Sequence, residues 1–598
     1  MADYRAPLAD MQFVLDNLVG YDEVSKFDVF THADRDTVVG LLDECARFVS
    51  EVWAPTNRPG DLEGSRLEGN EVITPESFGP AYKQLRDAGW GAVSHDPAFG
   101  GGGFPTVVGL AVQEMFNSAN MAFSMAPLLT NGAIDMLHAH GSEGQKEQFL
   151  PRLVSGEWTA TMNLTEPDAG SDVGNVRTRA VPQADGTYRI TGTKIFITFG
   201  EHDLTDNIVH LVLARTPDAP PGTKGISCFI VPKFLVHDDG SLGDRNDVSC
   251  VSIEHKMGIK ASPTCVLSYG EQGEGAVGYL IGDENAGMRY MFTMMNNARL
   301  GVGVEGLGIA QMAYQDAVQY AQERLQGRAP GAPGGTRSPI IEHPDVRRML
   351  LTMKAYVEAL RSLAFLTAAE IDRAQGHPDE AERTAAAERV DLYIPLVKGW
   401  GTDLGVEVAS LAVQVYGGMG YIEETGVAQL ARDVRITQIY EGTNGIQAMD
   451  LVGRKLPMRG GAVVADLVTR MRATADRLSA GPEALQPIGA RLTEAVAVFE
   501  EAAQWLGAQL GADVRDALGG ATPFLRLASQ TVGGWLLGDA ALAAQRELDA
   551  GRGERAFLEG KVVTARFYAD NLLPLVKGLL DPVRAGAADL LALEPAQF

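Results

Sequence analysis

The spacing of hydrophobic positions changes along the chain and divides it into segments. From about residue 36 to 160, apolar residues recur mostly three and four positions apart, as in DTVVGLLDECARFVSEVW, which predicts helices. From 161 to 282, short runs rich in β-branched residues, such as YRITGTKIFIT and NIVHLVLA, alternate with turn residues and predict strands. Helical spacing returns in long segments from about 284 to 455, and an Ala- and Leu-rich helical block follows.

This order predicts a multidomain α+β protein, because 598 residues are too many for one ordinary core. Spacers between strands are as short as PDAPPGTKG and hold no helical crossover, so an antiparallel sandwich or barrel is expected rather than a βαβ sheet. The long helical segments after it predict a bundle. The expected parts are an N-terminal extension, a helical domain, a β-domain, a bundle domain and a C-terminal helical extension: 1–35, 36–160, 161–282, 283–455 and 456–598.

Charge and cysteine usage narrow the classes of function. Lys and Arg number 51 against 77 Asp and Glu, a net charge of -26, so the surface should repel nucleic acid and anionic lipid. From the opening MADYRAPLADMQFVL we expect neither a signal peptide nor a spanning helix. No His/Cys cluster has metal-ligand spacing, and the four scattered cysteines fit small core residues in a reduced, cytoplasmic compartment: Cys45, Cys228, Cys250 and Cys265.

Two segments offer a ligand-binding surface at the β-domain. The turn from Met162 to Asp172 carries hydroxyls, a proline and a glycine and could aim N–H groups and hydroxyls at a ring edge or a phosphate; it could equally be an ordered junction between domains. In the predicted strand KIFITFG, two-residue alternation places Phe196 and Thr198 on one face. That pair suits a flat heterocycle, although an ordinary half-buried strand has the same pattern.

The segment TQIYEGTNGIQ holds a candidate base. Glu441 follows an apolar and aromatic approach and precedes Gly442, which lets another molecule come close to the backbone. Desolvation would raise the pKa of this carboxyl toward neutrality; the alternative is an exposed glutamate at a helix end. Glycines in QVYGGMGY could admit a phosphate or end a helix, and GVGVEG at 301–306 lacks the preceding strand of a dinucleotide site, so we expect close helix packing there.

Together these motifs resemble the acyl-CoA dehydrogenase family. TEPDAGSD, KIFIT, EHKMGIKASPT, QVYGGMGY and IYEGTNGIQ occur in the family's order across about residues 40–455. The resemblance implies an N-terminal helical domain, a β-barrel-like domain and a four-helix bundle, with FAD bound where the three meet and across a subunit interface. It also implies a homo-oligomer, a dimer or a tetramer, that passes electrons to an electron-transfer flavoprotein.

The resemblance also assigns roles to individual residues. Thr165 and Thr198 would hydrogen-bond the flavin near N5 and O4, and Phe196 would stack on it. Further contacts to the FAD would come from Met162, Leu164, Gly170, Ser171, Ile197 and Thr443. The neighbouring subunit would contact the FAD through Arg324, Gln414, Gly417 and Gly418. Acyl-CoA would contact Ser171, Asn296, Arg299 and Gly442.

The implied mechanism begins at Glu441, which would remove the pro-R α-proton of an acyl-CoA while a hydride leaves the β-carbon for flavin N5, giving trans-2-enoyl-CoA. The backbone N–H of Glu441 and a flavin ribityl hydroxyl would stabilise charge on the thioester oxygen. This brings the pKa of the α-carbon closer to the pKa of the Glu441 carboxyl. Phe196 stands where the family often has Trp, which preserves stacking. A Phe and a Gln of the family's dinucleotide contacts are replaced near Gly327 and at Gly445.

The opening YRAPLADMQFVLDNL and the C-terminal extension resemble a bacterial branch of large enzymes that includes 3-methylmercaptopropionyl-CoA dehydrogenases. This resemblance implies that the substrate is 3-methylmercaptopropionyl-CoA or a similar short acyl-CoA. Medium- or long-chain fatty acyl-CoA dehydrogenation and acyl-CoA oxidation stay open. A DNA-binding relative of the alkylation response is disfavoured, because the extension carries 14 basic and 17 acidic residues. Its most apolar stretch, PFLRLASQTVGGWLLGDAALAA, is interrupted by Arg526 and Asp539, so it should pack in a bundle or a dimer interface rather than in a membrane.

Overall fold

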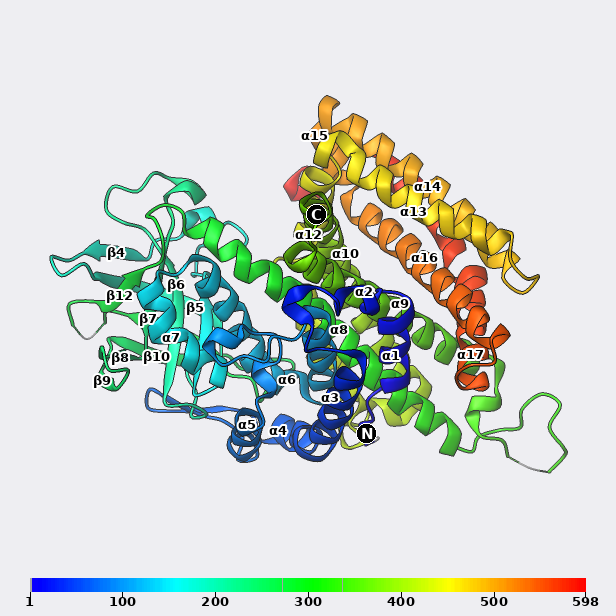
Figure 1. Cartoon of the computed structure of the whole chain (residues 1–598), viewed down its shortest axis with the longest axis horizontal. Helices are drawn as coiled ribbons and strands as arrows, with labels where there is room; N and C mark the ends of the chain where they lie inside the picture. The colour runs from blue at the N-terminus through cyan, green and yellow to red at the C-terminus, as the bar shows by residue number, and fades with distance from the viewer. Residues whose placement is uncertain (1–2, 272, 336) are drawn as a thin grey trace. The chain divides into compact units, whose positions relative to one another are not determined.

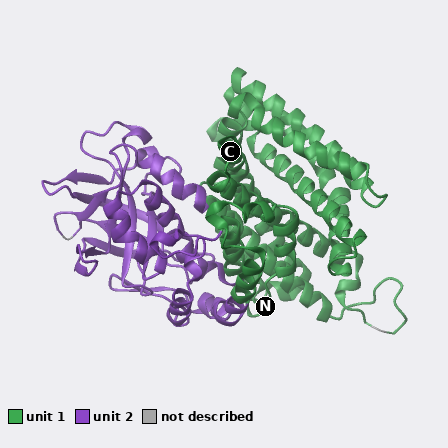
Figure 2. Ribbon diagram, viewed as in Figure 1, with its two compact units in different colours: residues 1–46, 105–118, 299–598 green, residues 47–104, 119–298 purple. Residues whose placement is uncertain are grey.

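The computed structural model describes residues 3–271, 273–335 and 337–598. The chain divides into two compact units (Figure 2): unit 1 comprises residues 1–46, 105–118 and 299–598, and unit 2 comprises residues 47–104 and 119–298. Unit 1 is helical, whereas unit 2 contains the sheet (Figure 1). Each unit is described by itself below.

Long helices build unit 1, as their spacing predicts. α10 begins after Asp379, whose side chain accepts a hydrogen bond from the N–H of Ala381, and it ends at Gly417, which has a positive φ. α6 and α8 also extend into unit 2. The helices of unit 1 are α1 (Leu8–Asn17), α2 (Tyr21–Val24), α3 (Arg35–Phe48), the start of α6 (Thr106–His140), most of α8 (Gly287–Glu323), α9 (Pro344–Gly376), α10 (Glu380–Tyr416), α11 (Val427–Val434), α12 (Asn444–Asp450), α13 (Ala462–Ser479), α14 (Gln486–Ala512), α15 (Val514–Gly519), α16 (Ala521–Asp549), α17 (Arg555–Asn571) and α18 (Leu580–Arg584).

The C-terminal extension packs onto the bundle through α16. Most of this helix is buried, and a Cβ at Gly533 would lie 2.5 Å from the Trp400 ring on α10. The apolar stretch around Trp535 therefore lies inside the helical unit, which confirms the expected bundle packing. Among the described residues, no helix has both the length and the apolar character needed to cross a membrane.

The glycines of the GVGVEG segment lie where α8 touches α10. A Cβ at Gly303 would lie 2.5 Å from Val397 Cγ1, and one at Gly306 would lie 2.4 Å from the Gly401 carbonyl oxygen. These glycines therefore allow two helix backbones to approach each other, as the sequence predicts.

We expect Gly306→Ala to lower the free energy of unfolding by about 1–3 kcal/mol, because the new methyl group meets backbone rather than a movable side chain. Gly560→Ala on α17 is the matched control, since nothing lies within 4 Å of a Cβ there; it should be neutral or slightly stabilising through helix propensity. Urea unfolding of both variants measures the difference, and equal effects would contradict the packing argument.

Unit 2 contains a hairpin, short helices and a larger mixed sheet. The sheet runs in the order β10-β11-β5-β12-β7-β6-β3, with β4 paired to β5. Its elements are α4 (Asn57–Glu63), β1 (Arg66–Glu68), β2 (Glu71–Ile73), α5 (Phe78–Asp87), the remainder of α6, α7 (Glu143–Ser155), β3 (Trp158–Asn163), β4 (Arg179–Pro182), β5 (Tyr188–Thr198), β6 (Asn207–Ala214), β7 (Ser227–Pro232), β8 (Phe234–Val236), β9 (Leu242–Arg245), β10 (Val248–Ile253), β11 (Thr264–Tyr269) and β12 (Ala276–Leu280).

Strand β6, which lies between β7 and the edge strand β3, is buried along its whole length. Val209, Leu211 and Leu213 join a core cluster with residues of α7 and β3, whereas Val212 and Ala214 join a second cluster with residues of β5, β7 and β11. Both faces of the strand are therefore covered, which explains why its sequence reads as a continuous apolar run.

Two features differ from the sequence prediction. Among the described strands, β3 pairs with β6 in parallel and the other pairings are antiparallel, so the sheet is mixed rather than purely antiparallel, and it does not close into a barrel. The β1–β2 hairpin interrupts a region predicted to be helical. Local spacing could not reveal the parallel pairing, because β3 and β6 are separated by β4 and β5 along the chain.

Candidate active site

Glu441 lies in unit 1 on a strained turn that leads into α12. Glu441 has φ +54° and Gly442 has φ +81°, and left-handed backbone is unfavourable for a residue with a side chain. Thr443 caps α12, because its hydroxyl accepts a hydrogen bond of 3.3 Å from the N–H of Ile446. The cap and the glycine contribute to the shape of the turn, and the Glu441 side chain is half-buried.

Burial and nearby cations together set the proton affinity of Glu441. Burial raises the pKa of Glu441 to about 7, while the cations of Arg299 and Lys398 oppose the rise. Arg299 on α8 is buried and lies 3.7 Å from Asp450, and its Nε finds no hydrogen-bond partner among the residues that the structure describes. A carboxyl with this pKa exchanges protons near neutral pH, as a general base requires.

A second carboxyl, which is buried, lies close to Glu441. Glu305 on α8 is fully buried and accepts a hydrogen bond from the hydroxyl of Tyr440, the residue before Glu441. Burial raises the pKa of Glu305 to about 8, and the nearby charge of Glu441 contributes to the rise. The raised pKa favours the protonated form of Glu305, which reduces the repulsion between the two neighbouring carboxyl groups.

If Glu441 acts as a general base, we expect kcat/KM of the reaction that it serves to rise with pH through about 7 and then level off, because the raised pKa of Glu441 leaves its carboxyl protonated below that value. Initial rates measured over pH 5.5–9 at substrate concentrations well below KM test this expectation. A flat profile, or activity that falls through pH 7, would contradict Glu441 as the group that must lose its proton.

The predicted flavin-edge residues meet in unit 2. The N–H of Ile195 in β5 donates 2.9 Å to the carbonyl of Thr165, which joins β5 to the segment after β3. Phe196 is 59% exposed, and its φ of +59° breaks the regular alternation that the sequence suggested. Thr198 is half-buried at the end of β5. The exposed aromatic ring and the two half-buried hydroxyl residues thus lie on two segments that are hydrogen-bonded to each other.

The remaining predicted residues of unit 2 differ in exposure. Met162 and Leu164 are half-buried, Ile197 is buried, and Gly170 and Ser171 are exposed just after the Glu166–Ala169 turn. Nothing lies within 4 Å of a Cβ at Gly170. Asn296 is half-buried on α8.

A buried ion pair supports the two hydrogen-bonded segments. The Nζ of Lys194 lies 2.8 Å from Glu166 Oε1 and donates 3.0 Å to the carbonyl of Leu164, and Lys194 is fully buried. Sequence reasoning missed this pair, because a lone lysine in a strand usually points to solvent. Its position between strand residues and the opposite charge within the TEPD motif were the available signals.

In unit 1, the residues predicted to reach a neighbouring subunit are exposed. Arg324 follows α8, and Gln414, Gly417 and Gly418 lie at the end of α10. The stacked rings of Tyr320 and Tyr416, 3.9 Å apart, hold the two helix ends together, so these residues are brought into one region.

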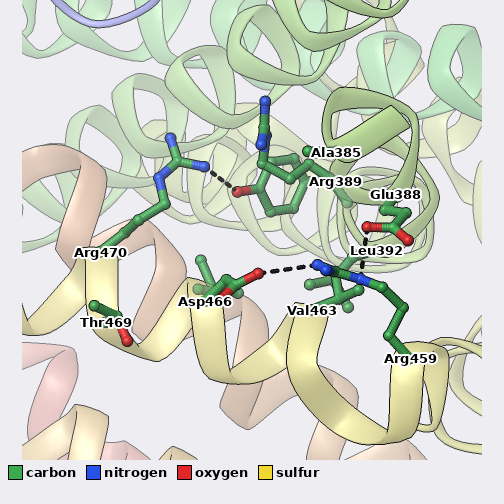
Figure 3. A pocket seen from close by; sticks show the side chains of 11 residues that line it. Ala385, Glu388, Arg389, Leu392, Arg459, Val463, Asp466, Thr469 and Arg470 are labelled. Carbon is green, nitrogen blue, oxygen red and sulfur yellow. Dashed lines mark hydrogen bonds and ion pairs between the residues drawn. The ribbon is translucent and has the colours of Figure 1, made fainter. Parts of the chain in front are cut away.

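A separate cavity of about 290 Å³ lies between α10 and α13 (Figure 3). Arg389 pairs with Glu370, and Arg459 pairs with Glu388 and Asp466. Arg470 donates to the hydroxyl of Tyr393 and lies over the Trp535 ring. Its lining contains none of the residues predicted for the site.

Comparison with family models covers most of the chain. Acyl-CoA dehydrogenase N-terminal, middle and C-terminal domain models match residues 39–157, 161–271 and 285–456. A model described as acetyl-CoA dehydrogenase C-terminal like matches residues 467–594. The helical extension thus has counterparts in other proteins.

Individual relatives span nearly the whole chain. A 3-methylmercaptopropionyl-CoA dehydrogenase of Ruegeria pomeroyi is 50% identical over 95% of this chain and 96% of its own length. A broad-specificity linear acyl-CoA dehydrogenase of Mycobacterium tuberculosis is 37% identical over the full length of both. The solved structure of an acyl-CoA dehydrogenase with FAD from Bacillus anthracis, 22% identical, covers 94% of this chain and 89% of its own with a TM-score of 0.72, which concerns the fold alone. The chain belongs to the acyl-CoA dehydrogenase family.

Proposed function

We propose that the protein uses FAD to dehydrogenate an acyl-CoA thioester between its α- and β-carbons, with 3-methylmercaptopropionyl-CoA or a similar short acyl-CoA as substrate. The observation that carries the proposal is the half-buried Glu441 with its raised pKa on a strained turn. The 50% identity to a 3-methylmercaptopropionyl-CoA dehydrogenase over nearly both full lengths supports the choice of substrate.

The flavin-edge residues suit an FAD. Phe196 offers an exposed ring for stacking, and Thr165 and Thr198 offer hydroxyls in adjoining segments. The open backbone at Gly417 and Gly418, where nothing lies within 4 Å of a Cβ, suits a phosphate or ribose. The other predicted contacts would complete the site: Met162, Leu164, Gly170, Ser171, Ile197, Thr443, Arg324 and Gln414.

The chain's own residues would perform the proton chemistry. Glu441 takes the α-proton on a carboxylate oxygen, and its partial desolvation makes it a stronger base than an exposed glutamate. The backbone N–H of Glu441 stabilises the thioester oxygen, and Gly442 keeps the turn free of a side chain where the thioester approaches. Asn296 and Arg299 contact the acyl-CoA. Bound FAD supplies the acceptor for the two electrons that leave with the β-hydrogen.

Electrons would pass to an electron-transfer flavoprotein, and the enzyme would act as a homo-oligomer. Arg324 and Gln414 are exposed in the single chain, as expected for residues that complete a neighbouring subunit's site. A peroxide assay in air separates this reading from an acyl-CoA oxidase: a dehydrogenase yields little peroxide and turns over only with an electron acceptor.

An anaerobic titration of the purified holoenzyme with a panel of acyl-CoAs tests the proposed function. 3-Methylmercaptopropionyl-CoA should bleach the flavin absorbance at stoichiometric amounts, and longer fatty acyl-CoAs should require an excess. If only a long-chain thioester bleached the flavin at stoichiometric amounts, the substrate would instead be a long-chain fatty acyl-CoA. If no acyl-CoA thioester bleached the flavin, the proposed dehydrogenation would be rejected.

A further inference from the structure

Lys398 is a buried lysine beside the proposed base. It lies on α10 with none of its surface exposed, among residues that are also buried. Its Nζ donates 2.7 Å to the carbonyl oxygen of Gly442 and 2.9 Å to Asn444 Oδ1. Both acceptors belong to the turn that carries Glu441. A fully buried lysine is rare unless it is paired, and the role assigned to Glu441 does not account for this one.

The same stretch of α10 holds the far side of the turn. Asn444 Nδ2 donates 3.0 Å to the carbonyl of Gly399 and 2.7 Å to Asp403 Oδ1. Asn444 is therefore held through both ends of its amide, by Lys398 at the oxygen and by α10 acceptors at the nitrogen. The turn is fixed to one rigid helix rather than left to its own backbone.

This attachment matters because the turn is strained. Glu441 and Gly442 both have positive φ, and for Glu441 that conformation persists only where surrounding contacts impose it. The carbonyl of Gly442 receives the Lys398 amine and also the amide of Gln447, at 3.2 Å. Loss of the amine would remove the shorter of these two contacts and allow the Glu441 side chain to turn away from its present direction.

We propose that Lys398 is a positioning residue of the dehydrogenase: its amine ties the Glu441–Asn444 turn to α10 and thereby fixes the direction of the Glu441 carboxylate. The inference rests on the proposed function, because it concerns the base of that reaction. Lys398 touches neither the substrate nor the flavin in this role and acts through the backbone of Gly442 and the side chain of Asn444.

The charge of Lys398 also acts on the proton equilibrium of the site. The groups that surround it are Glu441 on the turn, Arg299 and Glu305 on α8, and Asp403 on its own helix. Burial lowers the pKa of Lys398, and the three carboxyl groups oppose that fall. Since its cation is among the causes that hold down the pKa of Glu441, a neutral residue at this position should raise the pKa of the base.

Lys398→Met removes both the hydrogen bonds and the charge. We expect kcat to fall about 10–100-fold, the size of effect that lost hydrogen bonds to a charged group produce, with little change in KM for the acyl-CoA. The acidic limb of the pH profile should move to higher pH. Lys398→Gln, which keeps a donor without the charge, should recover part of kcat while the limb stays displaced.

Lys561→Met is the matched control. Lys561 is another buried lysine of unit 1, but it pairs with Asp10 and Glu358, so its loss should reduce stability and leave kcat per bound flavin and the pH profile unchanged. Flavin content and thermal melting are measured for each variant, and rates are expressed per bound flavin.

The proposal is overturned if Lys398→Met has the kcat and pH profile of the wild type, or if KM rises while kcat is retained. If Lys398→Met does not accumulate as holoenzyme, Lys398→Gln tests the proposal instead. A kcat and a pH profile equal to those of the wild type in this variant would reject the positioning role. A failure of the proposed function itself is distinct, because the wild-type holoenzyme would then not bleach with any acyl-CoA.

Discussion

Glu441→Gln should lower the rate of acyl-CoA dehydrogenation by about 10²–10⁴-fold, the range that a positioned general base contributes. Glutamine preserves the shape of the side chain and the strained turn but cannot accept the α-proton. The acyl-CoA should therefore still bind, and the protein should keep its yellow cofactor. Stopped-flow flavin reduction under anaerobic conditions measures the loss directly.

Glu424→Gln is the control for this variant, because Glu424 is exposed and lies outside the proposed site; it should reduce flavin at the wild-type rate. The role of Glu441 would be refuted if Glu441→Gln turned over at the wild-type rate. It would also be refuted if the variant lost activity only through loss of the flavin.

Arg361→Met should cause the largest loss of stability among the changes considered, by breaking a buried charge network in unit 1. Arg361 on α9 is 1% exposed; its Nε donates 2.9 Å to Glu114 on α6, and its Nη1 contacts Asp10 on α1. Asp10 also contacts Lys561 on α17. The network thus connects the N-terminal extension, the bundle and the C-terminal extension.

Removing the arginine leaves Glu114 buried without its cation, and breaking a buried pair from one side costs about 3–5 kcal/mol. Urea unfolding followed by tryptophan fluorescence measures the change. The double variant Arg361→Met/Glu114→Gln should regain part of the loss, because no uncompensated glutamate remains. Arg35→Met, which removes an ion pair with Asp16 whose arginine is 44% exposed, should cost less than about 1 kcal/mol; a similar loss in both arginine variants would contradict the argument.

The sequence motifs identify the proposed base and the candidate flavin-edge segments, but not the buried lysines that support them. Glu441 stands out because it precedes a glycine within an apolar approach, and Phe196 stands out in its strand. Lys194 and Lys398 do not stand out, because their burial depends on elements that pack around them from other parts of the chain. The carboxylate and carbonyls that accept from them come from distant positions or from irregular backbone.

The fold shows the same division between local and non-local information. Helical spacing predicts long helices such as α8 and α10, and the glycines at 303 and 306 predict their close approach, since each of these signals is local. The parallel pairing of β3 with β6 and the bulge that turns Phe196 outward are set by which strands become neighbours. The alternation of residues along a single strand does not indicate which strands become its neighbours.

Proton removal by Glu441 is tested most directly by the rate of flavin reduction with α-dideuterated 3-methylmercaptopropionyl-CoA. If the carboxylate of Glu441 breaks the α-carbon–hydrogen bond during reduction, the deuterated thioester should reduce the wild-type flavin several-fold more slowly than the protiated one, and Glu441→Gln should reduce it hardly at all. Equal rates for the two thioesters, together with undiminished reduction in Glu441→Gln, would contradict the assignment.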